Sequence, residues 1–171
     1  MMKIAFLVLI VCILSSNTKA QSYYKVNGGF GFGLDYGGVI GTKLTYLPIK
    51  WLGLFGSVGL YYYYAGYSTG VQFKLPSKKR MSGYLTGMYG VNGEMETEVI
   101  ITAKQYNGTT IGAGLELKNK KRNTFWNLNL LVPFRDDQLK KDVADFESQG
   151  LSVFSTTWPV NFSIGFHANI H

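Results

Sequence analysis

The sequence predicts an all-β protein, an eight-stranded antiparallel, up-and-down transmembrane β-barrel with a short helix in its last outer loop. Three observations lead to this prediction. Eight segments alternate apolar and polar residues. Short connections between these segments alternate with longer ones. Basic and acidic residues separate to opposite ends of the predicted strands.

The first twenty residues are typical of a secretory signal peptide. A basic start precedes an apolar run at residues 4–14, which is too short to cross a bilayer as a helix, and Ala20 offers a cleavage point before Gln21. Residues 1–20 are therefore predicted to be removed, leaving residues 21–171 as one barrel domain. The single cysteine, Cys12, lies in the apolar run, and a mature chain without cysteine favours bacterial export.

Seven segments have one clearly apolar face, as expected for strands with a side-chain period of two. They cover about residues 23–34, 39–47, 51–63, 66–75, 111–118, 124–134 and 161–171. A further segment begins near Met81, and its facing is not evident. In the first segment Gly29, Gly31 and Gly33 share one face, so they are predicted to make room inside a narrow barrel rather than to form a nucleotide-binding loop.

The connections and charges define two ends of the predicted barrel. Residues 47–50, 76–80 and 119–123 form short, mostly basic turns, whereas residues 92–108 and 135–155 form long loops. The acids predicted at the loop end are Asp35, Glu94, Glu96, Glu98, Asp136, Asp137, Asp142, Asp145 and Glu147. Both chain termini and the short turns are expected in the periplasm, with the long loops outside.

Aromatic residues are placed near both predicted membrane boundaries, where an apolar ring with a polar tip is favoured. Trp51, Trp126, Tyr24 and Tyr46 fall at the turn end, and Tyr62, Tyr67, Tyr89 and Trp158 fall near the loop end.

Three stretches carry a resemblance to a known family: YLPIKWLGLFGSVG, FWNLNLLVPFR before a long acidic loop, and the terminal WPVNFSIGFHANIH. With the signal peptide followed by Gln21, they make the chain resemble the small outer membrane protein beta-barrel domain proteins of Bacteroidota. The resemblance covers most of residues 21–171 and implies insertion into outer-membrane lipid. The last strand also resembles the signal read by the barrel-assembly machinery, through Gly165, Phe166, Ala168 and Ile170. That signal usually ends in an aromatic residue, whereas this chain ends in Ile170 and His171.

The interior of an eight-stranded barrel is just wide enough to be filled by side chains. Six polar residues are predicted to point into it and to form a Lys–Glu pair with amide hydrogen bonds: Lys43, Gln72, Lys74, Glu116, Asn127 and Asn129. This interpretation makes the interior a structural filling, with a narrow ion leak as the alternative.

Catalytic and metal chemistry have little support in the sequence. His167 and His171 would lie about 13 Å apart on a strand, so no metal or cofactor is expected. A solvated histidine at the chain terminus is the better interpretation, and His167 is predicted to be on the strand face that points into the barrel. Lipid A-modifying barrels use serine, histidine and an acid near the outer leaflet. Here the outer serines Ser68, Ser152 and Ser155 have no histidine nearby, so no catalysis is predicted. No nucleic-acid partner is expected.

The long loops are the best candidates for a surface function. Residues 136–149 are predicted to form a helix that packs Leu139, Val143 and Phe146 on the rim. Alternation in residues 93–102 predicts that two strands protrude, leaving an edge to which another protein could add a strand.

The sequence therefore predicts an integral outer-membrane protein with a structural or surface-interaction role and an unidentified extracellular partner. Two alternatives stay open: a soluble, lipocalin-like carrier of a small apolar ligand, in the periplasm or secreted, and a lipid A-modifying enzyme.

Overall fold

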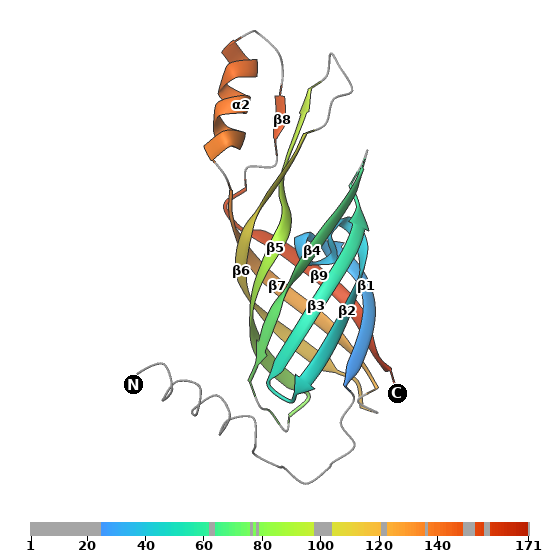
Figure 1. Ribbon diagram of the computed structural model, residues 1–171. Helices are drawn as coiled ribbons and strands as arrows, with labels where there is room; N and C mark the ends of the chain where they lie inside the picture. The colour runs from blue at the N-terminus through green and yellow to red at the C-terminus, as the bar shows by residue number, and fades with distance from the viewer. Residues whose placement is uncertain are drawn as a thin grey trace, which may run out of the picture.

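The computed structural model is a closed antiparallel barrel with an extension at one end (Figure 1). It describes residues 25–61, 64–75, 77, 79–97, 104–120, 123–135, 137–148, 153–155 and 158–170. The predicted signal peptide, residues 1–20, lies outside these ranges. The barrel strands are β1 (Val26–Gly33), β2 (Gly38–Ile49), β3 (Leu52–Leu60), β4 (Ala65–Lys74), β5 (Met81–Thr97), β6 (Lys104–Lys118), β7 (Thr124–Phe134) and β9 (Asn161–Ile170).

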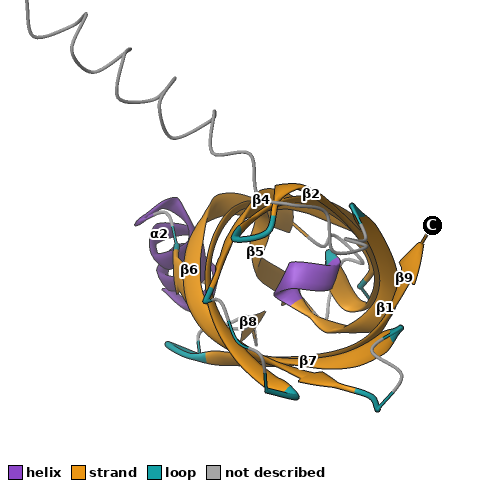
Figure 2. Ribbon diagram, turned by 90° about the horizontal axis from the view of Figure 1, so that it is seen from below, coloured by secondary structure: helices purple, strands orange, loops and turns teal. Residues whose placement is uncertain are grey.

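Each barrel strand pairs with its sequence neighbour, and β9 pairs back onto β1. The closing register runs from Val26 opposite Ile170 to Phe32 opposite Ile164. Seen along its axis the barrel forms a ring (Figure 2). Closure leaves no open sheet edge in the barrel wall, which explains why the regular last strand is needed at the chain end. The predicted eight-stranded up-and-down barrel is confirmed.

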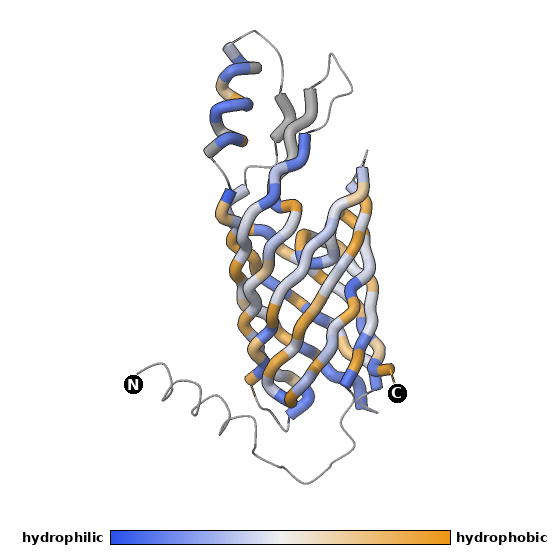
Figure 3. The backbone as a smooth tube through the Cα atoms, viewed as in Figure 1, coloured by the Kyte–Doolittle hydropathy of each residue, from blue (hydrophilic) through white to orange (hydrophobic). Residues whose placement is uncertain are grey.

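Hydrophobic and hydrophilic residues alternate along the barrel strands (Figure 3). Burial assigns the apolar residues mainly to the outer face of the wall and the polar residues mainly to the inner face. Phe30, Leu44, Val58 and Leu130 are each between 56 and 63% exposed on the outer face. Polar residues one position away, such as Lys43 and Asn129, are buried. The structure also assigns β5, whose facing the sequence does not show: Tyr84 and Thr86 point inward, while Leu85 and Tyr89 point outward.

The two ends of the barrel differ as predicted. The short β2–β3, β4–β5 and β6–β7 connections share one end, which we call the turn end, with the start of β1 and the end of β9 (Figure 1). At the opposite end, the loop end, β5 and β6 continue beyond the barrel beside the helix α2 (Asp137–Ser148) and the short strand β8 (Val153–Ser155). The predicted loop helix over residues 136–149 is confirmed within one residue at each end.

The protruding β5–β6 hairpin is present as predicted, and one of its two edges is covered by the chain itself. On the β5 side, Met95 to Thr97 pair with β8, from Met95 opposite Ser155 to Thr97 opposite Val153. The expected strand addition by another protein therefore has the β6 side of the extension as its candidate edge, and it stays a prediction.

Candidate functional site

The first connection of the barrel folds into the interior, where it forms a short 3-10 helix, η1 (Leu34–Tyr36), visible inside the ring in Figure 2. We call η1 the plug. Gly33 and Gly37 flank it with φ angles of 116° and 78°, which side chains with a Cβ rarely adopt. The backbone can therefore turn inward and return within a few residues. Leu34 packs against an apolar cluster of Phe55, Met88 and Leu131 in the interior.

Glycines on four strands create the space that the plug tyrosine, Tyr36, occupies. A Cβ on Gly165 would lie 1.9 Å from the Tyr36 hydroxyl oxygen, and one on Gly31 would lie 2.7 Å from its ring carbon Cζ. A Cβ on Gly41 or Gly59 would lie 1.9 or 2.6 Å from the Tyr36 carbonyl oxygen. The inward-facing glycines thus do make room, as the sequence predicts, and the residue that fills this room is Tyr36.

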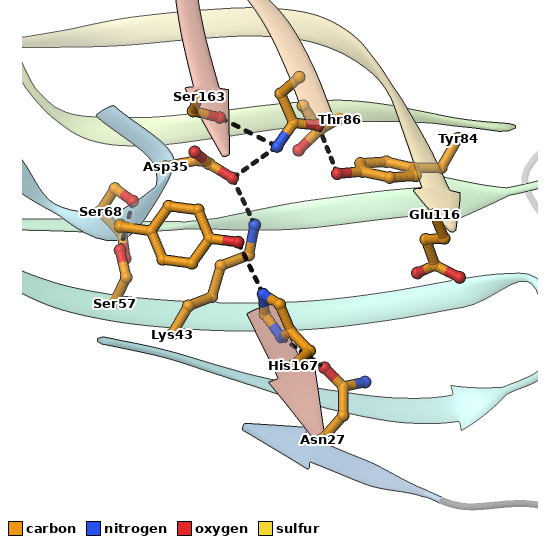
Figure 4. A network of polar contacts seen from close by, with 12 residues as sticks. Asn27, Asp35, Lys43, Ser57, Ser68, Tyr84, Thr86, Glu116, Ser163 and His167 are labelled. Carbon is orange, nitrogen blue, oxygen red and sulfur yellow. Dashed lines mark hydrogen bonds and ion pairs between the residues drawn. The ribbon is translucent and has the colours of Figure 1, made fainter. Parts of the chain in front are cut away.

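Asp35 of the plug forms a buried ion pair with Lys43 of β2, with Nζ donating to Oδ2 over 2.6 Å (Figure 4). Both side chains are essentially inaccessible to solvent, at 1 and 0% exposed. Asn129 also donates to Asp35 Oδ2, over 2.8 Å, accepts a hydrogen bond from Tyr84 and lies 3.1 Å from the Ser163 hydroxyl. The Lys43 ammonium lies 4.5 Å from the centre of the Phe55 ring.

This arrangement corrects the predicted position of Asp35. The sequence places Asp35 with the other acids at the loop end, whereas the structure buries it in the barrel. The physical reason is Lys43, whose buried charge needs an opposite charge nearby. The other predicted inward cation, Lys74, pairs with Glu116 over 2.5 Å, and Ser82 donates to the second carboxylate oxygen of Glu116.

His167 of β9 faces the interior, as the sequence predicts, but it is buried against the plug and is not solvated. Its Nδ1 lies 3.2 Å from the Asn27 amide oxygen, and its Nε2 lies 2.7 Å from the Tyr36 hydroxyl (Figure 4). An amide oxygen only accepts, so Nδ1 carries the proton and the neutral ring accepts from Tyr36. The imidazole also stacks on Phe125, with ring centroids 5.1 Å apart. The terminal His171 lies outside the described residues.

All six residues predicted to face the interior do so, but they do not form one cluster. Lys43 and Asn129 meet at Asp35, and Lys74 and Glu116 form a separate pair. Asn127 is buried, and its amide oxygen has no hydrogen-bond partner within the described ranges. Gln72 is buried, and its amide nitrogen has no hydrogen-bond partner within the described ranges. The interior residues that the sequence analysis missed are Asp35 and Tyr36, and with them the contacts that bury His167; the signal was the run of glycines on both sides of Leu34–Tyr36.

The interior is closed rather than open along its length. In a water-filled channel the lining side chains would be exposed, whereas inward residues from every barrel strand are buried, among them Asn27, Lys43, Ser57, Ser68, Thr86, Glu116, Asn127 and His167. The described residues contain no group of three or more histidines, cysteines or acids able to hold a metal ion. This geometry holds two ion pairs in the interior, and the carboxylate of each accepts a further hydrogen bond, from Asn129 at Asp35 and from Ser82 at Glu116.

At the loop end, α2 packs on the protruding hairpin. Leu139 is buried against Tyr106 of β6, with Val143 beside them. Asp142 of α2 accepts hydrogen bonds from Lys104 and Tyr106 of β6 and from Gln138 of its own helix. These bonds, led by the one from Lys104, lower the pKa of Asp142 to about 2. The helix is thus held to the β5–β6 extension, rather than to the rim of the barrel as predicted.

The four residues of the predicted assembly signal lie on both faces of β9. Phe166, Ala168 and Ile170 face outward, and Phe166 contacts Phe30 and Trp126. Gly165 faces inward beside Tyr36. Recognition of this strand by the assembly machinery stays a prediction.

Comparison of the chain with protein-family models, with curated proteins and with solved structures finds no match. Among the described residues, no helix is both long and apolar enough to cross a membrane.

Proposed function

We propose that this protein is an integral outer-membrane β-barrel with a closed interior, which presents the β5–β6 hairpin, β8 and α2 at the cell surface. The apolar outer face of the closed barrel is the observation that carries the proposal. Large apolar side chains on all eight barrel strands are exposed, for example Phe30, Ile40, Leu54, Phe73, Leu85, Leu115, Leu130 and Phe162. Such a surface is costly in water and is favourable in lipid, where barrels need no free strand edges.

The inner face supports this proposal over a lipocalin-like carrier. A carrier of a small apolar ligand needs an apolar cavity inside and a polar surface outside. Here two ion pairs, the plug and the His167 contacts occupy the interior, while the apolar residues are on the outside. Inserting an apolar ligand would require disrupting the Asp35–Lys43 pair.

The same interior supports a non-catalytic role without pore activity. Both ring nitrogens of His167 contact plug or β1 residues, Tyr36 and Asn27, instead of a serine nucleophile. The plug lies inside the ring of strands, on the side of β1 (Figure 2), and it narrows the interior through which an ion would have to pass. A surface role is favoured by the loop end, where α2 and β8 are both held to the protruding hairpin and form an ordered structure beyond the barrel.

Cell fractionation tests this proposal. When the full chain is expressed in a Gram-negative bacterium, we expect the mature protein in the outer-membrane fraction, soluble only in detergent. It should migrate differently on gels before and after boiling. Recovery in the soluble periplasmic fraction would contradict insertion. In planar bilayers the purified barrel should show no steady conductance, and a stable open current would contradict the closed interior.

Removal of residues 137–148 tests the surface role separately. We expect the shortened protein to insert to the same level as the complete chain, because the contacts that hold α2 among the described residues are with the β5–β6 extension and β8. If insertion is lost, α2 is needed for folding and is not a recognition element.

A further inference from the structure

Basic side chains surround the barrel at the turn end. We call them the basic rim: Lys25, Lys50, Lys79, Arg80, Lys118 and Lys120. All are exposed except Lys118, whose side chain is 28% exposed. The rim includes the residue before β1 and all three short turns, so the positive charge is spread around the whole end of the barrel.

Backbone hydrogen bonds tie neighbouring parts of this rim together. Leu47 donates to the carbonyl of Lys25, joining the start of β1 to the end of β2. Lys118 donates to the carbonyl of Arg80 over 2.8 Å, joining the β4–β5 turn to the end of β6. Arg80 and Lys118 are therefore held next to each other, and Lys25 is held to the neighbouring strand, so these basic residues are not carried on long loops.

Exposed acids do not balance this charge. The described acid nearest the turn end is Glu116, which is buried and already faces Lys74 and Ser82, with Lys118 at 3.9 Å. The other acids among the described residues lie in the interior or at the loop end. An anion approaching the turn end thus meets positive charge without a competing carboxylate at the surface.

An apolar and aromatic band lies directly beside the basic rim on the outer face of the wall. Trp51 follows Lys50 and stacks on Phe73, with ring centroids 6.3 Å apart. Trp126 pairs across the sheet with Leu117, the residue before Lys118. Both tryptophans are nearly half exposed. A ligand that matches both features has an apolar body next to an anionic head. A free anion would interact only with the basic rim, and a purely apolar ligand would contact only the aromatic band.

We propose that the basic rim binds the headgroups of anionic phospholipids in the leaflet at the turn end, while their acyl chains lie on the aromatic band. This inference rests on the membrane insertion proposed above. Each lysine or arginine near a negative membrane surface contributes about 1 kcal/mol, which corresponds to about a fivefold preference. Charge screening weakens this contribution at high salt.

The three tryptophans of the chain allow a direct test. Changing Trp158→Phe removes the tryptophan at the loop end and leaves Trp51 and Trp126 as reporters of lipid at the basic rim. This protein is reconstituted into vesicles that contain either dibrominated phosphatidylglycerol or dibrominated phosphatidylcholine at the same mole fraction. Bromine quenches tryptophan fluorescence on contact, so the ratio of quenching gives the relative affinity of the two lipids.

We expect phosphatidylglycerol to be preferred about fivefold or more, and the preference to fall in 0.5 M salt. In the same background, Lys50→Gln with Lys120→Gln should lower the preference about fivefold, since each change lies beside one reporter. The matched control, Lys140→Gln with Lys141→Gln in α2, removes the same charge at the opposite end and should leave the preference unchanged.

The outcomes separate the two proposals. Equal quenching by both lipids would overturn the anionic lipid site while supporting insertion. The absence of quenching by either lipid would overturn insertion itself. Equal loss of preference in the two double variants would also overturn the site, because the effect would then come from net charge alone.

Discussion

Lys43→Met should be among the most destabilising single changes in the barrel. It removes the cation that faces Asp35 and leaves a buried carboxylate whose remaining hydrogen-bond donor is Asn129. Methionine matches the length of the aliphatic part of lysine, so the change removes charge with little loss of packing. Removing one partner of a buried ion pair costs about 3–5 kcal/mol.

The opposite change, Asp35→Asn, should cost less, about 1–3 kcal/mol. The amide keeps a similar shape, and the Lys43 ammonium retains the faces of two rings, at 4.5 Å from Phe55 and 5.1 Å from Tyr36. Such cation–π contacts contribute about 2 kcal/mol when shielded from water. The double variant removes both charges and should return to within about 1 kcal/mol of the natural protein, because no unpaired charge remains.

Urea unfolding in detergent micelles at pH 8, followed by tryptophan fluorescence, measures the three free energies of unfolding. The predicted order of destabilisation is Lys43→Met, then Asp35→Asn, then the double variant. Additive costs in the double variant would refute a charge pair that acts as a unit. Equal costs for the two single changes would refute the stabilisation of the unpaired Lys43 ammonium by the two rings.

Three other predictions address the glycines, the last strand and α2. Gly165→Ala should destabilise the barrel by about 1–3 kcal/mol, because the new methyl group would overpack against Tyr36. The control Gly56→Ala should not destabilise it, because its Cβ would meet nothing within 4 Å. Equal melting temperatures for the two variants would contradict this prediction. Replacing Phe166 and Ile170 together by Asp should block insertion, since charge on a lipid-facing strand is destabilising, and normal levels in the outer-membrane fraction would contradict it. The pKa of Asp142 is lowered to about 2, so its stabilising effect is present above the ordinary value of 3.8 and is lost as pH falls through 2. Hydrogen-exchange protection of α2 should therefore persist at pH 4 and decrease near pH 2. Asp142→Asn should lower the protection of α2 at pH 7, and unchanged protection in this variant would exclude a stabilising role for Asp142.

Much of the fold was predictable because period-two alternation directly determines which face of a strand is buried. Seven segments have one dominant apolar face, and together with the segment that begins near Met81 they match the eight strands of the barrel wall in number and order. The facing of β5 was harder to predict because Tyr84 and Met88, which point inward, are as apolar as Leu85 and Tyr89, which point outward. In a narrow barrel, which of two apolar side chains points inward depends on their sizes and on their distance from the plug. The alternation of apolar and polar residues carries no information about these two properties.

The interior was predictable only in part, for a similar reason. Alternation identifies Lys43 and Lys74 as inward cations and Glu116 as an inward acid. It does not apply to Leu34–Tyr36, because this segment is a connection, and its path depends on contacts made after the barrel closes. Once Gly31, Gly165 and the φ angles at Gly33 and Gly37 are known, the inward path of the plug follows. His167 is buried by the same contacts, although it lies close to the chain end.

The central claim, that the apolar outer face contacts lipid and not water, can be tested most directly by cysteine labelling. The chain has one cysteine, Cys12, which lies in the predicted signal peptide, so the mature protein offers a cysteine-free background. Leu130→Cys places a thiol on the outer face of β7, and Ser77→Cys places one in an exposed turn. In reconstituted vesicles, a charged, water-soluble maleimide should label Ser77→Cys rapidly from the accessible side and should leave Leu130→Cys unlabelled until the protein is unfolded. Labelling of Leu130→Cys as fast as Ser77→Cys would show that the apolar face lies in water and would contradict the account.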